Sequence, residues 1–131
     1  MKFTRTSDSK YIWEVPKTFN VHPLALAHVK GRYCITGKDG KTYLEFWDGL
    51  LVIYKGYQFD GCTMSPDCKR ALRGCCVHDA LYQILRSFPE VFTYANADDV
   101  MLEMHREDRF WLRKVYHWVL QKYNTHIKKR Q

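Results

Sequence analysis

The sequence predicts an α+β protein in which a small N-terminal antiparallel β-sheet is followed by about three packed α-helices. In the first 60 residues, short apolar and aromatic runs alternate with turn residues, which is typical of strands. After residue 61, apolar residues recur at spacings of three and four, the period of a helix. A chain of 131 residues is long enough for one core, so a single domain is expected over 1–131, with strands mainly in 1–60 and helices mainly in 61–131.

Three apolar or aromatic runs are expected to be strands: residues 33–36, 42–47 and 50–54. Turn residues separate them, with Lys38-Asp39-Gly40 before the second run and Asp48-Gly49 before the third. Short connections of this kind join antiparallel neighbours, so the runs should form a small sheet or meander. Residues 21–29 show no strand alternation, and either a short helix or an ordered loop fits them.

The first helix is expected to begin near residue 67 or 69 and to continue to about residue 87. Phe88-Pro89 should end it there, because proline cannot continue a helix. The last helix is expected over residues 110–127. Apolar residues lie on more than one side of that helix, so it is expected to pack heavily.

The second helix is expected to begin at Asn96 as its N-cap residue and to run to about Asp108. Asp98 and Asp99 would then lie in its first turn. Acidic residues are favoured in a first turn by the exposed amides and the helix dipole alone. That position would explain the two aspartates without any catalytic role.

The chain is cationic, with 21 lysine and arginine residues against 14 aspartate and glutamate residues. Such an excess attracts polyanions such as nucleic acid or an anionic lipid surface, and it is also typical of a solvated surface. No apolar run reaches the length of about 18 residues that a membrane span requires. Residues 1–17 carry charges where a signal peptide would be apolar. We therefore expect no transmembrane segment, no signal peptide and a cytoplasmic location, which would be the host cytoplasm if the chain is viral.

The five cysteines are odd in number and follow no secretory signal, which favours reduced thiols. Four residues could in principle form a zinc site: Cys62, Cys68, Cys75 and His78. Their intervals of five, six and two residues lack the paired short spacings of known zinc ligands, so free buried cysteines are the simpler interpretation.

The strongest candidate for chemistry is the segment His78-Asp79-Ala80-Leu81-Tyr82, together with the acidic pair Asp98-Asp99 on the next helix. A histidine can act as a general base near neutral pH, and a neighbouring carboxylate can hold a hard cation. An aspartate returned by the second helix would fix the tautomer of the histidine, and the spacing leaves open which of the two does so. The loop at residues 56–61 offers backbone carbonyls and the carboxylate of Asp60 as further calcium ligands.

Four stretches of the chain match one family pattern: residues 56–61, Cys62-Thr63-Met64-Ser65-Pro66, His78-Asp79-Ala80-Leu81-Tyr82 and Ala97-Asp98. With them the chain resembles a phage and bacterial family designated domain of unknown function 1353. The resemblance spans roughly residues 50–105 and departs at Met64. It implies a virus or prophage origin and carries no activity of its own.

A second resemblance rests on Cys75-Cys76-Val77-His78-Asp79-Ala80-Leu81-Tyr82 and Tyr94-Ala95-Asn96-Ala97-Asp98. Their order and spacing are similar to the Cys-Cys-x-x-His-Asp-x-x-Tyr motif of phospholipase A2 and to the matching motif of its relative in parvovirus capsid proteins. The glycine-dense calcium loop of phospholipase A2 is not reproduced, because residues 60–63 contain one glycine.

The phospholipase resemblance implies a role for each matching residue. His78 would activate water, Asp98 would orient the histidine, and Tyr82 would support the aspartate by hydrogen bonding. Asp79 would bind calcium, for which Asp60 is the other candidate ligand in this chain. The calcium would stabilise the oxyanion that forms when water attacks an ester carbonyl.

Three functions fit the sequence. The first is a phage-associated hydrolase of esters or lipids, and the second is a non-catalytic phage accessory protein that binds a host protein, nucleotide or nucleic acid. In the second, the His-Asp-Tyr cluster would be a buried polar network. The third is a metal-dependent phosphohydrolase with four ligands: His22 or His28, His78, Asp79 and Asp98. That architecture is entirely helical, unlike the first 60 residues here.

Overall fold

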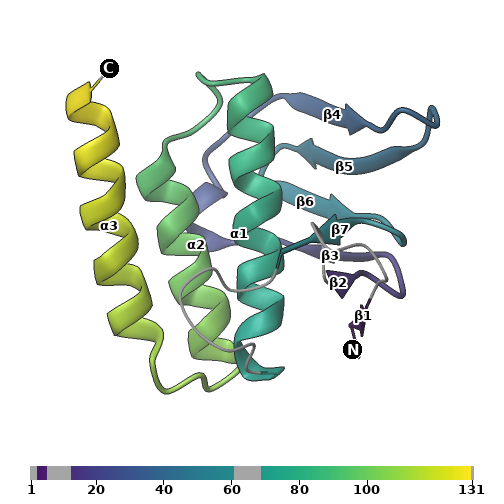
Figure 1. Cartoon of the computed structure of the whole chain (residues 1–131). Coiled ribbons are helices and arrows are strands. Elements are labelled where there is room, and N and C mark those ends of the chain that lie inside the picture. The colour runs from purple at the N-terminus through teal and green to yellow at the C-terminus, as the bar shows by residue number, and fades with distance from the viewer. Residues whose placement is uncertain (1–2, 6–12, 61–68, 131) are drawn as a thin grey trace.

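The computed structural model describes residues 3–5, 13–60 and 69–130 of the chain. Within these ranges every strand precedes the long helices, which confirms the predicted α+β class. Helices α1 and α2 lie between α3 and the strands (Figure 1). No described helix is long and apolar enough to cross a membrane.

The described strands form two antiparallel sheets rather than one. The smaller sheet has the order β1-β2-β7, with β1 at Thr4–Arg5, β2 at Trp13–Glu14 and β7 at Gln58–Phe59. The larger has the order β3-β6-β5-β4, with β3 at Phe19–Val21, β6 at Leu50–Ile53, β5 at Thr42–Trp47 and β4 at Arg32–Thr36. The three predicted runs are therefore the β4-β5-β6 meander, to which β3 adds as an edge strand.

The turn between β5 and β6 explains why Asp48-Gly49 punctuates the sequence. Asp48 has φ of 48° and Gly49 has φ of 87°, the two positive values that a tight hairpin turn requires. The Asp48 carboxylate also accepts a hydrogen bond of 2.9 Å from the backbone N–H of Gly31. Residues 21–29, which the sequence left open, contain the end of β3 and the short 3-10 helix η1 (Leu24–Leu26).

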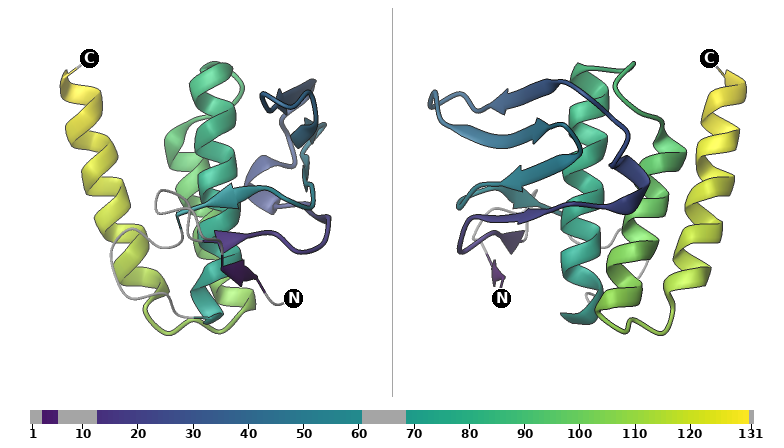
Figure 2. Two further views of the ribbon diagram at one scale, coloured as in Figure 1. Left: turned by 45° about the vertical axis from the view of Figure 1, so that its right-hand side comes forward. Right: turned by 180° about the vertical axis from the view of Figure 1, so that it is seen from behind.

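Helix α1 (Lys69–Ser87) ends where Phe88-Pro89 predicts. Its sheet-facing residues share one hydrophobic core with strands β5 and β6. The fully buried members of this core include Leu44, Phe46, Leu51, Ile53, Cys76, Val77, Ala80, Leu81 and Ile84. The core fixes how α1 lies on the sheet, and the opposite face of α1 is left to pack on α2 (Figure 2).

Helix α2 (Tyr94–Glu107) begins earlier than predicted, because Thr93 and not Asn96 is its N-cap. The Thr93 hydroxyl accepts the Asn96 N–H at 3.0 Å, and the Asn96 side chain accepts the Thr93 N–H at 3.1 Å. This reciprocal capping box places Asn96 at the third helical position. Asp98 and Asp99 therefore lie beyond the first turn, so the helix dipole does not account for them.

Helix α3 (Arg113–Arg130) begins three residues after the predicted start. One side packs as expected, with buried Tyr116 in a cluster that includes Met101 and Phe110. The expectation that the helix is covered on more than one side is wrong for Val115 and Trp118, which are 54% and 57% exposed. Their apolar side chains face outward because α2 is the described helix against which α3 packs.

Helices α1 and α2 approach closely at Gly74. A Cβ atom at this position would lie 2.6 Å from Nε2 of His105 and closer still to Cδ2. The His105 ring is fully buried there, donates to the Ala71 carbonyl at 3.0 Å and packs edge-on against Phe110. Burial lowers the pKa of His105, which favours the neutral form of the ring. Glycine is thus the residue that lets a histidine fit between the two helices.

We expect Gly74→Ala to destabilise the protein by about 1–3 kcal/mol, because the new methyl group overlaps a ring that cannot move freely. Urea unfolding measures this cost. In a His105→Ala background the same change should cost little or become stabilising, since alanine favours a helix over glycine by about 1 kcal/mol. An equal cost in both backgrounds would contradict the steric explanation.

Candidate active site

His78, Tyr82 and Asp98 form one hydrogen-bonded network between α1 and α2. The His78 Nε2 atom lies 2.7 Å from Oδ1 of Asp98, and the Tyr82 hydroxyl donates to the same oxygen at 2.7 Å. The carboxylate is fully buried and the histidine is 7% exposed. The structure thus brings together the three residues to which the sequence assigns catalysis.

The local sequence explains how these side chains meet. His78 and Tyr82 are four residues apart on α1, so they project from the same face one turn apart. Their ring centroids are 4.0 Å apart, and Tyr94 packs edge-on against Tyr82 at 4.9 Å. Helix α2 packs along this face of α1 and delivers Asp98 to both.

An ionised carboxylate only accepts hydrogen bonds, so the bond to Asp98 assigns the proton of the neutral histidine ring to Nε2. The other ring nitrogen, Nδ1, then carries a lone pair. A histidine oriented in this way by a carboxylate is the arrangement that general-base catalysis uses. The Tyr82 hydroxyl supplies a second donor to the carboxylate, which offsets part of the cost of burying its charge.

The structure also resolves which aspartate faces His78. Asp98 does so, whereas the Asp99 carboxylate lies 2.7 Å from Nε2 of His117 on α3. The two acids are about 100° apart around α2, so each meets a histidine from a different neighbouring helix. The Asp99–His117 pair is much more exposed than the Asp98–His78 pair.

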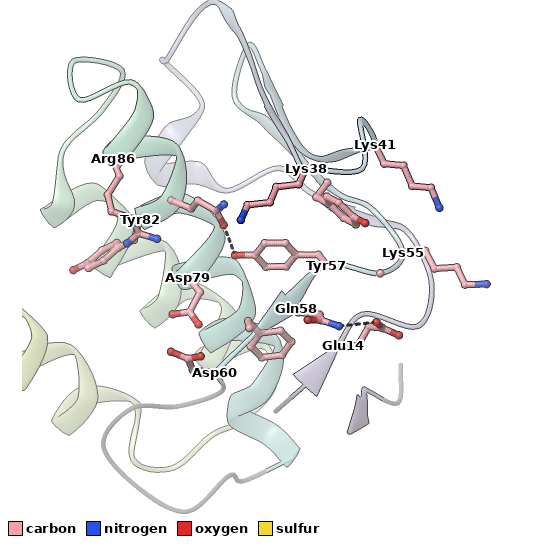
Figure 3. Close-up of a pocket in the computed structure, with 15 residues that line it drawn as sticks. Glu14, Lys38, Lys41, Lys55, Tyr57, Gln58, Asp60, Asp79, Tyr82 and Arg86 are labelled. Carbon is pink, nitrogen blue, oxygen red and sulfur yellow. Dashed lines mark hydrogen bonds between the residues drawn. The ribbon is translucent and has the colours of Figure 1, made fainter. Parts of the chain in front are cut away.

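Asp79 points away from this network and toward Asp60 (Figure 3). Burial raises the pKa of Asp79 to about 7, and the nearby charge of Asp60 adds to the shift. The backbone N–H of Asp60 donates to the Asp79 carboxylate and acts in the opposite direction. Two close carboxylates, one of them largely buried, create a negative site that a bound cation would neutralise.

A calcium ion takes six to eight oxygen ligands, of which Asp60 and Asp79 could supply two. Burial and the charge of Asp60 are sufficient to explain the raised pKa of Asp79. In the ranges that the structure describes, no three histidine, cysteine, aspartate or glutamate side chains gather into a metal site. The motif residues 61–68 lie outside those ranges.

A cavity of about 1100 Å³ opens between α1 and the two sheets (Figure 3). Its α1 wall consists of Asp79, Tyr82, Gln83 and Arg86. The Tyr57 hydroxyl crosses from the sheet side and donates to Gln83 at 3.1 Å. Tyr82 therefore both lines the cavity and bonds to Asp98, while His78 is not among the described residues of the wall.

The sequence interpretation missed the basic side chains that line this cavity. They are Lys38, Lys41, Lys55 and Arg86. Arg86 follows Asp79 by seven residues, so helical periodicity alone could have placed both on one face of α1. The lysines come from the turns after β4 and β6, and their meeting with α1 depends on how the sheet packs.

The expectation of reduced thiols is wrong for Cys75, which is disulfide-bonded. An odd number of cysteines excludes complete pairing but leaves room for individual bridges. Cys34 and Cys76 are free, and burial raises the pKa of the Cys76 thiol well above its usual range. The zinc hypothesis fails at Cys75, because a disulfide sulfur is not a thiolate ligand. Cys62 and Cys68 lie outside the described residues.

Comparison of the chain with protein-family models, curated proteins and solved structures finds no match. The resemblances to the phage family and to phospholipase A2 therefore stay predictions.

Protonation of Asp79 gives a pH dependence that can be measured in EDTA. An ordinary aspartate has a pKa of about 3.9, so between about pH 4 and pH 7 the folded state holds a proton that the unfolded state has lost. The free energy of unfolding should fall as the pH rises through this window. At pH 8, Asp79→Asn should be more stable than the parent by roughly 2 kcal/mol.

Asp60→Asn is the graded control, because removing the like charge should flatten the slope only in part. Urea unfolding at several pH values gives each slope. An Asp79→Asn variant with the parent's slope would show that another group titrates.

Proposed function

We propose that this protein is a small ester or lipid hydrolase with a phospholipase A2-like His/Asp site, and that it is of phage or prophage origin. The observation that carries the proposal is the sharing of one Asp98 oxygen by His78 and Tyr82, both at 2.7 Å. The same three positions match the phospholipase motif in order and spacing. The cavity beside Tyr82 offers room for a substrate.

In the proposed reaction, Nδ1 of His78 takes a proton from a water molecule as its oxygen attacks the ester carbonyl carbon. Asp98 keeps the proton on Nε2 and stabilises the positively charged ring. The tetrahedral adduct then expels the alcohol oxygen, which receives the proton from His78. The products are a carboxylic acid and an alcohol, and the histidine returns to its neutral form.

Asp79 and Asp60 are the residues that would hold calcium. When bound, the ion would supply the positive charge that stabilises the oxyanion of the tetrahedral adduct. The lining holds four basic residues against the acids Glu14, Asp60 and Asp79, so with calcium bound the cavity would favour a substrate with an anionic group. Tyr82 connects the two parts of the site, because its ring lies against His78 and the residue also lines the cavity.

The second candidate function is a non-catalytic accessory protein that binds a host protein, nucleotide or nucleic acid. The burial of the network favours it, since Asp98 is fully buried and His78 is 7% exposed. A buried polar network of this kind can fix one packing of two helices without any reaction. The two candidate functions predict different effects of a substitution in the network: loss of turnover for a hydrolase, and loss of stability alone for an accessory protein.

Substitution of His78 by Gln should reduce turnover of a chromogenic carboxylic ester and of phospholipid in mixed micelles by roughly 10²–10⁴-fold. Asp98→Asn should reduce it as well, because the amide no longer fixes the tautomer. The matched control is His117→Gln, which breaks the other His–Asp pair of the same length, and it should leave turnover within twofold. A folded His78→Gln variant with parental turnover would refute the catalytic role. Parental protein without any turnover, combined with a loss of stability in both variants, would favour the accessory protein.

Calcium should raise the midpoint of thermal unfolding of the parent protein, because it compensates the Asp60 and Asp79 charges in the folded state. Asp79→Asn should abolish the increase, whereas Asp99→Asn, an exposed acid on α2, should keep it. Magnesium is the ion control, since it demands a tighter octahedral set of ligands. An equal increase in the parent and in Asp79→Asn would place the ion elsewhere.

A further inference from the structure

The outer face of α3 and the turn that precedes it carry an exposed apolar stripe, which we define as Trp111, Val115 and Trp118. Their exposed fractions are 76%, 54% and 57%. Val115 and Trp118 are three residues apart on α3 and so lie on one side of the helix, while Trp111 lies in the turn just before it. They make up most of the large hydrophobic side chains that are exposed in the described part of the chain. Clustering of this kind marks an interaction surface, whereas single exposed apolar residues are ordinary.

This stripe is not needed to hold α3 on the protein. The opposite side of the helix does that, because buried Tyr116 and partly buried Leu120 pack in one cluster with Leu112, Phe110 and Met101. Figure 2 places α3 at the edge of the molecule, with no described helix or strand beyond it. Helix α3 is therefore apolar on two sides, and the rest of the described protein covers one of them.

The C-terminal segment that includes α3 accounts for the net positive charge of the protein. Residues 109–131 contain seven basic residues and no acidic residue. These seven equal the net charge of +7, because the other 14 basic residues are matched in number by the 14 acidic residues. On α3, Lys114 and Lys122 are exposed, and the Lys122 Nζ lies 4.2 Å from the centroid of the Trp118 ring. The Lys122 ammonium group and the Trp118 ring therefore lie side by side on the exposed face of α3.

We propose that the outer face of α3 docks on an anionic lipid membrane, with the helix lying in the plane of the interface. The lysines would meet the headgroup charges while Trp111, Val115 and Trp118 enter the boundary with the acyl chains. Tryptophan favours this boundary, because its ring is apolar and its N–H remains hydrated. A lipid surface fits better than nucleic acid, since Val115 can neither stack on a base nor contact a phosphate. The proposal rests on α3 and is independent of the hydrolase activity.

The test is co-sedimentation of the full chain with vesicles of phosphatidylglycerol and phosphatidylcholine, or of phosphatidylcholine alone. We expect binding to the anionic vesicles that weakens as salt is raised, with a blue shift of tryptophan fluorescence. The double substitution Trp111→Ala/Trp118→Ala should weaken binding at least tenfold. Lys114→Glu/Lys122→Glu should weaken it as strongly at low salt, and circular dichroism would establish that each variant is folded.

The chain offers a matched control in Trp47. It is 54% exposed, and the Arg32 guanidinium lies 5.5 Å from its ring centroid, so it has the exposure and the cation contact of Trp118 but lies on β5. Trp47→Ala should bind vesicles within twofold of the parent. Failure of the parent to bind anionic vesicles would overturn the proposal, and so would parental binding by the double tryptophan variant. Tighter binding to duplex DNA than to vesicles, or a dimer that the double variant dissolves, would assign the face to another partner.

Discussion

The arrangement of the helices depends on the burial of one carboxylate, that of Asp98. A charge removed from water is strongly destabilising unless other groups compensate it, and here a histidine and a tyrosine from the neighbouring helix do so through the same oxygen. Both donors come from α1, one turn apart, so the carboxylate can be satisfied in one register of α2 on α1. The polar contact therefore defines a position that apolar packing alone would leave adjustable. The close approach at Gly74 holds the same helix pair at a second point.

The angular geometry of α1 separates two kinds of chemistry. His78 and Asp79 are adjacent in the chain, yet about 100° of helical rotation directs one toward α2 and the other toward the cavity and Asp60. Tyr82 lies between these directions and takes part in both. An acidic pair and an oriented histidine can thus lie close together without Asp79 pairing with His78. This separation is the physical basis for the hydrolase proposal.

Helix α3 has a different relation to the rest of the molecule. It packs through a small aromatic cluster around Phe110 and Tyr116, and it is joined to α2 by the more exposed Asp99–His117 pair. Val115 and Trp118 on its outer face are not part of that cluster. The seven uncompensated basic residues and the exposed tryptophans of this segment are the features on which the proposed membrane contact rests. The His78-Tyr82-Asp98 network lies between α1 and α2, whereas the exposed apolar residues lie on the far side of α3.

The sequence by itself determined the class of fold, the β4-β5-β6 meander, the end of α1 at Phe88-Pro89 and the identity of the His-Asp-Tyr segment. These features follow from local periodicity and turn chemistry, which act over a few residues. It misplaced the start of α2, because Thr93 and Asn96 are both good caps and only the reciprocal hydrogen bonds select Thr93. For Asp98, the resemblance to phospholipase A2 favoured this residue as the partner of His78, and the structure shows the contact. The tertiary structure alone decided that Cys75 is bridged, that lysines from two turns line the cavity and that one side of α3 is uncovered. Each of these features depends on which elements pack together across long sequence separations. Local sequence patterns do not predict such packing.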